Sequence, residues 1–148
     1  GLADPGPVAQ TFFMDDDIAD QYLLDSILTL VDAVHASTTL DTRQEARRQI
    51  GFADQIFISK TDIADEAAVD ALVHRIKHMN PRAPQRKVHF GAVPVAEVFD
   101  LRGFNLNAKL EIDPLGTYYN RRLLRWAGHA SRMPMSRVPR KLLTSWVA

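Results

Sequence analysis

The 148-residue sequence contains no cysteine, and this absence excludes several kinds of chemistry at once. Without cysteine there can be no disulfide, no thiolate zinc site and no thiol nucleophile. The absence suits a reducing compartment, so we expect a cytoplasmic protein. The sequence also has no apolar run near the ~20 residues that span a bilayer, so no membrane span is expected.

The first ten residues, GLADPGPVAQ, lack both a basic region and a long apolar region. They are therefore not typical of a signal peptide. The chain begins with glycine and lacks an initiator methionine, so we expect either a fragment or a processed form.

Acidic side chains are absent from the last part of the chain. All 18 Asp and Glu residues lie in residues 1–113, although the formal net charge of the whole chain is zero. This asymmetry predicts two segments, a folded part over 1–113 and a weakly structured basic tail over 114–148. A patch for nucleic acid or an anionic membrane fits the tail, but a solvated tail explains the same residues, and nucleic acid is not the partner that we expect. The candidate residues of this patch are Tyr118, Tyr119, Arg121, Arg122, Arg125, Trp126, Arg137, Arg140, Lys141 and Trp146.

Hydrophobic residues make up 46% of the chain, which is enough for a core. Three short apolar runs predict strands at Ile27–Val31, Gln55–Ile58 and Lys87–Phe90. Between the first two strands we expect a helix with Thr42 as N-cap and Glu45 at the capping-box position. Alternating strands and helices predict an α/β fold with a parallel sheet and right-handed crossovers.

A second helix is predicted between the last two strands, because apolar residues recur there at helical spacing. Pro81 ends the pattern. The apolar stripe consists of Val69, Leu72, Val73, Ile76 and Met79. Shorter helices are expected near the N-terminus and within residues 94–99.

The residues Ser59-Lys60-Thr61-Asp62 follow the second predicted strand, at the edge where open α/β sheets bind ligands. Guanine presents two adjacent donors, and one ionised carboxylate such as Asp62 accepts both, whereas adenine has no such pair. The stem of Lys60 would lie along the face of the base, with its ammonium near the sugar. Ser59 would hold the loop. Alternatively, Asp62 is the N-cap of the next helix and Lys60 is solvated.

Other polar residues allow two interpretations each. His74 and His78 are four apart on one helix face and fit either a metal site or plain exposure. His35 follows the first strand and is a candidate for the ligand edge, while His89 is expected to be structural. Asp32 fits either a ligand contact or a turn. The cluster Asp15-Asp16-Asp17 fits either a cation site or a helix cap.

Four ordered motifs, GLADPGPVAQTFF, VDAVHA, RRQIGFADQIFISKTD and MNPRAP, together resemble the CobW family of P-loop GTPases over about residues 1–113. The resemblance implies a partial P-loop NTPase fold, a Rossmann-like three-layer sandwich that lacks its P-loop half. It implies that Ser59, Lys60 and Asp62 bind the guanine end of GTP. It also places Gly91, Ala92 and Val93 in a second loop beside the base.

The function implied by this resemblance is GTP hydrolysis coupled to delivery of zinc or cobalt, the latter in cobalamin biosynthesis. The partners implied are guanine nucleotide, a client protein that receives the metal, and a second copy of the chain. Magnesium and zinc are implied as well, but their family ligands are absent from these residues. The alternative is a non-enzymatic truncated or interaction module whose basic tail binds an anion.

We predict that the 148-residue chain alone has no appreciable GTPase activity. A P-loop requires G-x-x-x-x-G-K-[ST], and no Gly-Lys pair occurs in the sequence. Phosphate release from GTP and magnesium should therefore stay at the level of the protein-free control. Turnover that increases with protein concentration would contradict the prediction.

Overall fold

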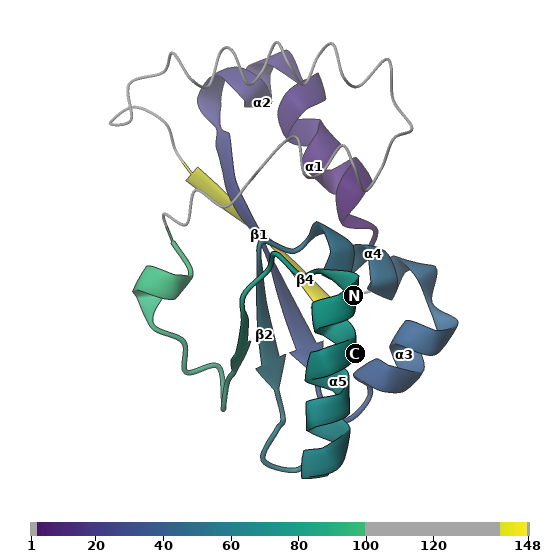
Figure 1. The fold of residues 1–148 in the computed structure, drawn as a ribbon. Coiled ribbons are helices and arrows are strands. Elements are labelled where there is room, and N and C mark those ends of the chain that lie inside the picture. The colour runs from purple at the N-terminus through teal and green to yellow at the C-terminus, as the bar shows by residue number, and fades with distance from the viewer. Residues whose placement is uncertain (1–2, 100–139, 148) are drawn as a thin grey trace.

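The computed structural model describes residues 3–99 and 140–147, the latter as backbone. These residues form a sheet of four parallel strands in the order β3–β2–β1–β4 (Figure 1). The strands are β1 (Leu23–Asp32), β2 (Gln55–Ser59), β3 (Gln85–Lys87) and β4 (Arg140–Val147). The predicted α/β class with a parallel sheet is confirmed.

Helices precede β1, connect β1 to β2 and β2 to β3, and follow β3. They are α1 (Pro5–Met14), α2 (Asp16–Gln21), α3 (Ala36–Thr42), α4 (Gln44–Phe52), α5 (Glu66–Met79) and the 3-10 helix η1 (Val95–Glu97). Helices α3 and α4 connect β1 to β2, and α5 connects β2 to β3. None of the described helices is long and apolar enough to cross a membrane.

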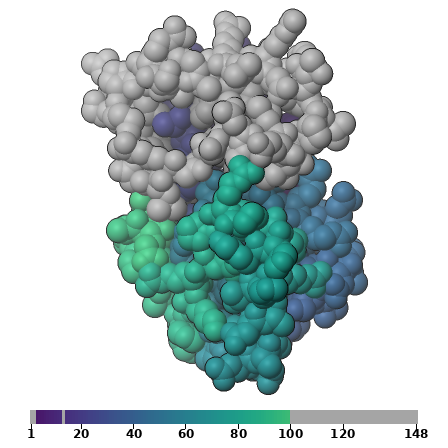
Figure 2. Space-filling model, in the orientation of Figure 1, coloured from purple at the N-terminus to yellow at the C-terminus, as the bar shows by residue number. Residues whose placement is uncertain are grey.

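Strand β2 shows how the sheet divides the core, because successive side chains point to opposite faces. Ile56 and Ile58 pack with the buried residues of α3, α4 and α5, including Leu72. Phe57 points to the other face and packs in a smaller cluster with Val88. The main core therefore lies between the sheet and helices α3–α5. The outer surface of α5 is flanked by the η1 segment on one side and by α3 and α4 on the other (Figure 2).

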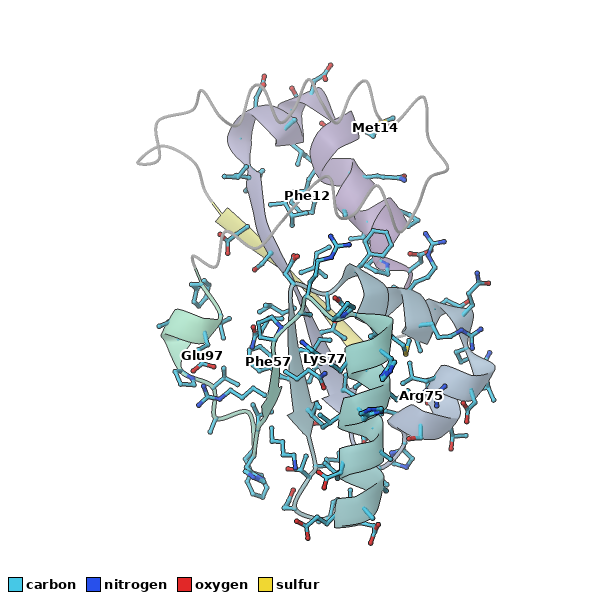
Figure 3. All side chains as sticks on the ribbon, viewed as in Figure 1. Phe12, Met14, Phe57, Arg75, Lys77 and Glu97 are labelled. Carbon is cyan, nitrogen blue, oxygen red and sulfur yellow. The ribbon has the colours of Figure 1, made fainter. Side chains whose placement is uncertain are left out.

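Helix α5 forms as the sequence predicts. Its N-cap is Asp65, whose side chain accepts a hydrogen bond from the Ala68 amide at 3.0 Å. Most of the predicted stripe is fully buried, and Val73 and Met79 pack at its margin. On the solvent side, Arg75 extends toward α3 and binds Asp41 at 2.7 Å (Figure 3).

The predicted strand Lys87–Phe90 lies too far along the chain. Strand β3 covers Gln85–Lys87, and its ladder with β2 ends at the pair Ile58↔Lys87, one residue before the end of β2. Phe90 is fully exposed and has a φ angle of 47°, so the chain turns there and leaves the sheet. The β-rich composition of this run predicted a strand, but no neighbouring strand extends far enough to pair with all of it.

The predicted capping box is also wrong. Thr42 is the last residue of α3, and its hydroxyl donates to the Thr38 carbonyl at 2.9 Å. Arg43 is extended and separates α3 from α4, which begins at Gln44. The hydroxyl of a threonine can bond the preceding turn of a helix as well as begin a new one, and here the preceding turn is helical.

Strand β4 was not predicted, because it lies in the segment that we expected to be weakly structured. It pairs with β1 in parallel, from Leu23↔Arg140 to Val31↔Val147. The expected domain boundary at residues 113 and 114 lies outside the described residues. The same holds for the side chains of the proposed basic patch, so that hypothesis remains a prediction.

Asn80 joins the ends of α4 and α5 and supports a prediction about stability. It is 7% exposed, and its amide nitrogen donates to the carbonyls of Ile50 and Ala53, each at 2.9 Å. Its oxygen accepts from the Arg82 and Ala83 amides. Because Asn80→Ala leaves buried backbone groups unpaired, we expect it to lower the free energy of unfolding by about 2–3 kcal/mol.

Urea denaturation followed by circular dichroism measures this effect. His74→Ala, on the exposed side of α5, is the control and should change stability by no more than about 0.5 kcal/mol. Equal denaturation midpoints for Asn80→Ala and the unmodified chain would contradict the role of this side chain.

Candidate functional site

The carboxyl ends of β1 and β2 lie side by side. Asp32 and Ser59 are register partners, so both strands end at the same level of the sheet. The Ser59 hydroxyl donates to the Val31 carbonyl at 3.1 Å, and the Ala33 amide donates to the Ser59 carbonyl at 3.0 Å. Ser59 thus holds the start of the loop that follows β2, which is the structural role that we expected for it.

Lys60 is in the left-handed region, with a φ angle of 59°. Its side chain crosses from the end of β2 to the end of β1, where Nζ lies 2.7 Å from Asp32 Oδ2. We expected the Lys60 ammonium near a sugar, whereas in the structure it is bound to the Asp32 carboxylate. The Lys60 side chain is 44% exposed, so part of its stem faces solvent.

Asp32 is a buried carboxylate with several donors, and its side chain is 3% exposed. Besides Lys60, it accepts from the Val34 amide at 2.9 Å, and the His35 ring nitrogen Nδ1 lies 3.1 Å from Oδ2. Burial raises the pKa of this carboxyl, but the hydrogen bonds from Lys60, His35 and the Val34 amide outweigh burial and lower the pKa from 3.8 to about 2. Asp32 therefore stays ionised, and it forms the turn after β1 that was one of its two expected roles.

Asp62 lies in the same loop and points to solvent, with 44% of its side chain exposed. It does not cap the next helix, because Asp65 is the N-cap of α5. That alternative is therefore wrong. Asp62 forms an ion pair with His89, whose Nδ1 lies 3.7 Å from the carboxylate. An exposed carboxylate at this edge of the sheet is free to accept donors from a ligand.

The contact between Asp62 and His89 brings a second loop to the site. This loop, residues 89–93, follows β3 and contains Gly91 with a φ angle of 73°. The Ala92 amide donates to the His89 carbonyl at 2.9 Å, which closes the turn. Val93 packs against the smaller core cluster. The two predicted groups, Ser59–Asp62 and Gly91–Val93, therefore belong to neighbouring loops at one edge.

The other candidate residues either have structural roles or lack further metal ligands nearby among the described residues. His74 and His78 lie with ring centroids 4.5 Å apart on the exposed side of α5. No group of three or more His, Cys, Asp or Glu residues that could hold a metal occurs in the described part of the chain. Asp15 is the N-cap of α2, which was one of the two roles expected of the aspartate cluster.

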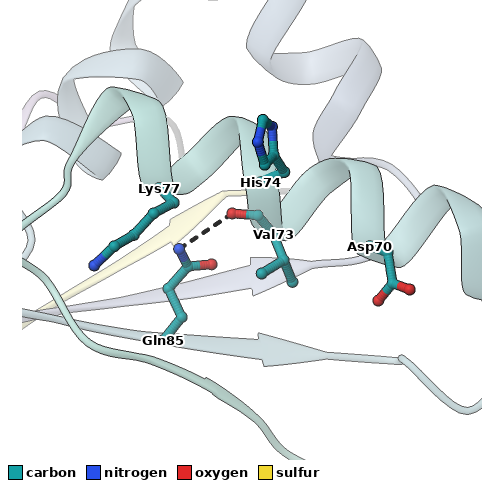
Figure 4. A pocket seen from close by; sticks show the side chains of 5 residues that line it. All are labelled: Asp70, Val73, His74, Lys77 and Gln85. Carbon is teal, nitrogen blue, oxygen red and sulfur yellow. Dashed lines mark hydrogen bonds between the residues drawn. The ribbon is translucent and has the colours of Figure 1, made fainter.

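A pocket of about 510 Å³ lies along the flank of the molecule, between α5 and β3 (Figure 4). It is lined by Asp70, Val73, His74, Lys77 and Gln85. The Gln85 amide donates to the Val73 carbonyl at 3.2 Å and spans its floor. Gln85 is the first residue of β3, so this pocket lies away from the carboxyl ends of the strands and is distinct from the candidate site.

A parallel α/β sheet with polar loops at its carboxyl edge is typical of nucleotide-binding domains. The CobW/HypB/UreG nucleotide-binding domain matches residues 1–87. The chain therefore belongs to the CobW/HypB/UreG family, as the sequence motifs predicted. The match includes Ser59, Lys60 and Asp62 and ends before the 89–93 loop.

Known proteins support this assignment. The zinc chaperone YjiA of Escherichia coli is 42% identical over 106 residues, which are 72% of this chain and 33% of YjiA. The zinc-regulated GTPase metalloprotein activator 1 of Schizosaccharomyces pombe is 31% identical and is covered to 26%. The crystal structure of Zn(II)-bound YjiA GTPase superposes with a TM-score of 0.63 at 41% identity, over 71% of this chain and 32% of that one. The chain thus spans about a third or less of these relatives.

Two pairings at the site were not predicted, namely Lys60 with Asp32 and Asp62 with His89. The sequence contains a signal for the first, because an aspartate ends one apolar run and a lysine follows the next. Parallel neighbouring strands bring such residues together. The second pairing depends on how the chain turns after β3, and the strand bounds that we predicted there were wrong.

The ionised state of Asp32 leads to a pH prediction. Its pKa is about 2 in the folded chain and ordinarily 3.8, so its ionised form stabilises the fold above about pH 4. The contribution, about 2 kcal/mol at most, is lost as the pH falls toward 2. The difference in unfolding free energy between the unmodified chain and Asp32→Asn should therefore shrink over this range.

Urea midpoints measured at several pH values test the prediction. Asp16→Asn, which changes an exposed aspartate in α2, is the matched control for the loss of one carboxylate. If the unmodified chain and Asp32→Asn lose stability in parallel between pH 4 and pH 2, Asp32 is not the group responsible.

Proposed function

We propose that this chain supplies the guanine-binding part of a GTPase that couples GTP hydrolysis to delivery of a metal ion, zinc or cobalt, to a client protein. The observation that carries the proposal is the exposed carboxylate of Asp62 at the carboxyl edge, in a loop that Ser59 holds against β1. The contact between Asp62 and His89 supports a role for the 89–93 loop as the second wall of the base site.

The chemistry of the base explains why one carboxylate gives selectivity. The N1–H and exocyclic amine of guanine are parallel donors that match the two oxygens of Asp62, which makes a charge-assisted pair. Hypoxanthine keeps N1–H but lacks the amine, and adenine has neither donor at these positions. Affinity should therefore fall from guanine to hypoxanthine to adenine.

The metal-delivery part of the proposal rests on the relatives, which are named as a zinc chaperone and as zinc-regulated GTPase metalloprotein activators. The described residues contain no cluster that fits magnesium or zinc. We therefore assign neither hydrolysis nor metal transfer to the described residues of this chain. Its own residues bind and orient the base.

The test is a titration of the 148-residue chain with GMP, IMP and AMP, in which binding is monitored by NMR chemical shifts. Because each hydrogen bond to a charged group contributes about 1.5–3 kcal/mol, GMP should bind at least about tenfold more tightly than AMP. Asp62→Ala should remove this preference. Asp70→Ala, which removes an exposed carboxylate from α5, is the matched control and should keep it. Equal binding of GMP and AMP by the unmodified chain would reject the proposal.

A further inference from the structure

Asp32 is a buried charge that base recognition by Asp62 does not explain. It lies on the neighbouring strand, and its donors are Lys60, His35 and the Val34 amide. Removing a carboxylate from water is costly, and a turn after β1 needs only one of its oxygens. Oδ1 accepts from the Val34 amide, so Oδ2 is left for Lys60 and His35.

The contact at Oδ2 determines where the Lys60 side chain lies. Lys60 follows the end of β2 and has a left-handed backbone conformation. The 2.7 Å contact between Lys60 Nζ and Asp32 Oδ2 fixes the tip of the side chain at the end of β1. Between these two fixed points, the methylene stem must cross the carboxyl edge. A lysine without such an anchor samples many rotamers, and ordering it on binding lowers the affinity.

We infer that Asp32 is a positioning residue, which holds Lys60 so that its stem forms a fixed apolar surface for the face of a purine base. This inference rests on the proposed function, because it assumes that the base binds at this edge. Asp62 recognises the edge of the base, whereas Asp32 acts on its face through Lys60. Asp32 itself does not touch the nucleotide.

This division of roles has a measurable consequence. Because every purine has the same kind of face, loss of the anchored stem weakens the binding of GMP, IMP and AMP by the same factor. The preference for GMP is kept, because Asp62 is unchanged. A purely structural role for Asp32 would give a different result, since a disordered 59–62 loop would also lose the preference.

The experiment compares Asp32→Asn, Lys60→Met and the double variant by NMR titration of the 148-residue chain with the three nucleotides. Asp32→Asn keeps the shape of the side chain but loses the charge, and Lys60→Met keeps the stem but loses its anchored tip. Each single variant should weaken the binding of all three nucleotides about three- to tenfold. The ratio of the affinities for GMP and IMP should stay unchanged. The double variant should bind no more weakly than either single variant, because both changes break one contact.

Lys87→Met is the matched control, since Lys87 ends the adjacent strand β3 and makes an exposed contact with Asp70 at 3.5 Å. It should bind like the unmodified chain. If Asp32→Asn does not fold, Lys60→Met decides the question, because it leaves the carboxylate in place with its His35 and Val34 donors.

The inference is overturned if Lys60→Met binds all three nucleotides as tightly as the unmodified chain. It is also overturned if the losses in the double variant add, or if the ratio of GMP to IMP collapses in the single variants. Failure of the proposed function gives another pattern, in which the unmodified chain itself shows no preference for GMP and Asp62→Ala has no effect.

Discussion

The parallel pairing of β1 with β2 is the constraint from which the candidate site follows. Five register pairs bring Asp32 level with Ser59 at the carboxyl edge. Once the strands end together, a lysine just after β2 can reach an aspartate at the end of β1, and the Ser59 hydroxyl can reach the backbone of β1. A shift of one residue in this register would turn every side chain of β2 to the opposite face and separate these groups.

Burial explains why this register is strongly specified. Ile56 and Ile58 are completely buried against helices α3–α5, and Phe57 packs on the opposite face. A slip of one residue would exchange the faces of these side chains, so that Phe57 would take the place of the isoleucines against the helices. The rigid packing beneath the edge then allows the 59–62 loop to hold a left-handed residue and an exposed carboxylate, neither of which stabilises the fold by itself.

The family model and the structure give evidence about different parts of the candidate site and its surroundings. The family model covers β1, β2 and α5 and therefore the residues that hold Ser59, Lys60 and Asp62. It does not reach the 89–93 loop or β4. The position of these two elements comes from the structure: His89 approaches Asp62, and β4 covers the edge of β1 that β2 leaves open.

The sequence by itself determined the α/β class, two of the strands, α5 and the loop that carries Asp62. These features depend on local patterns, namely apolar runs of strand length, a helical stripe, and capping or turn residues next to them. Only the tertiary structure decided which charges meet. The partners Asp32 and Lys60 are 28 residues apart, and Asp62 and His89 come from different connections. The end of β3 and the pairing of β4 were decided in the same way, because a strand extends only as far as a neighbour offers backbone groups to bond.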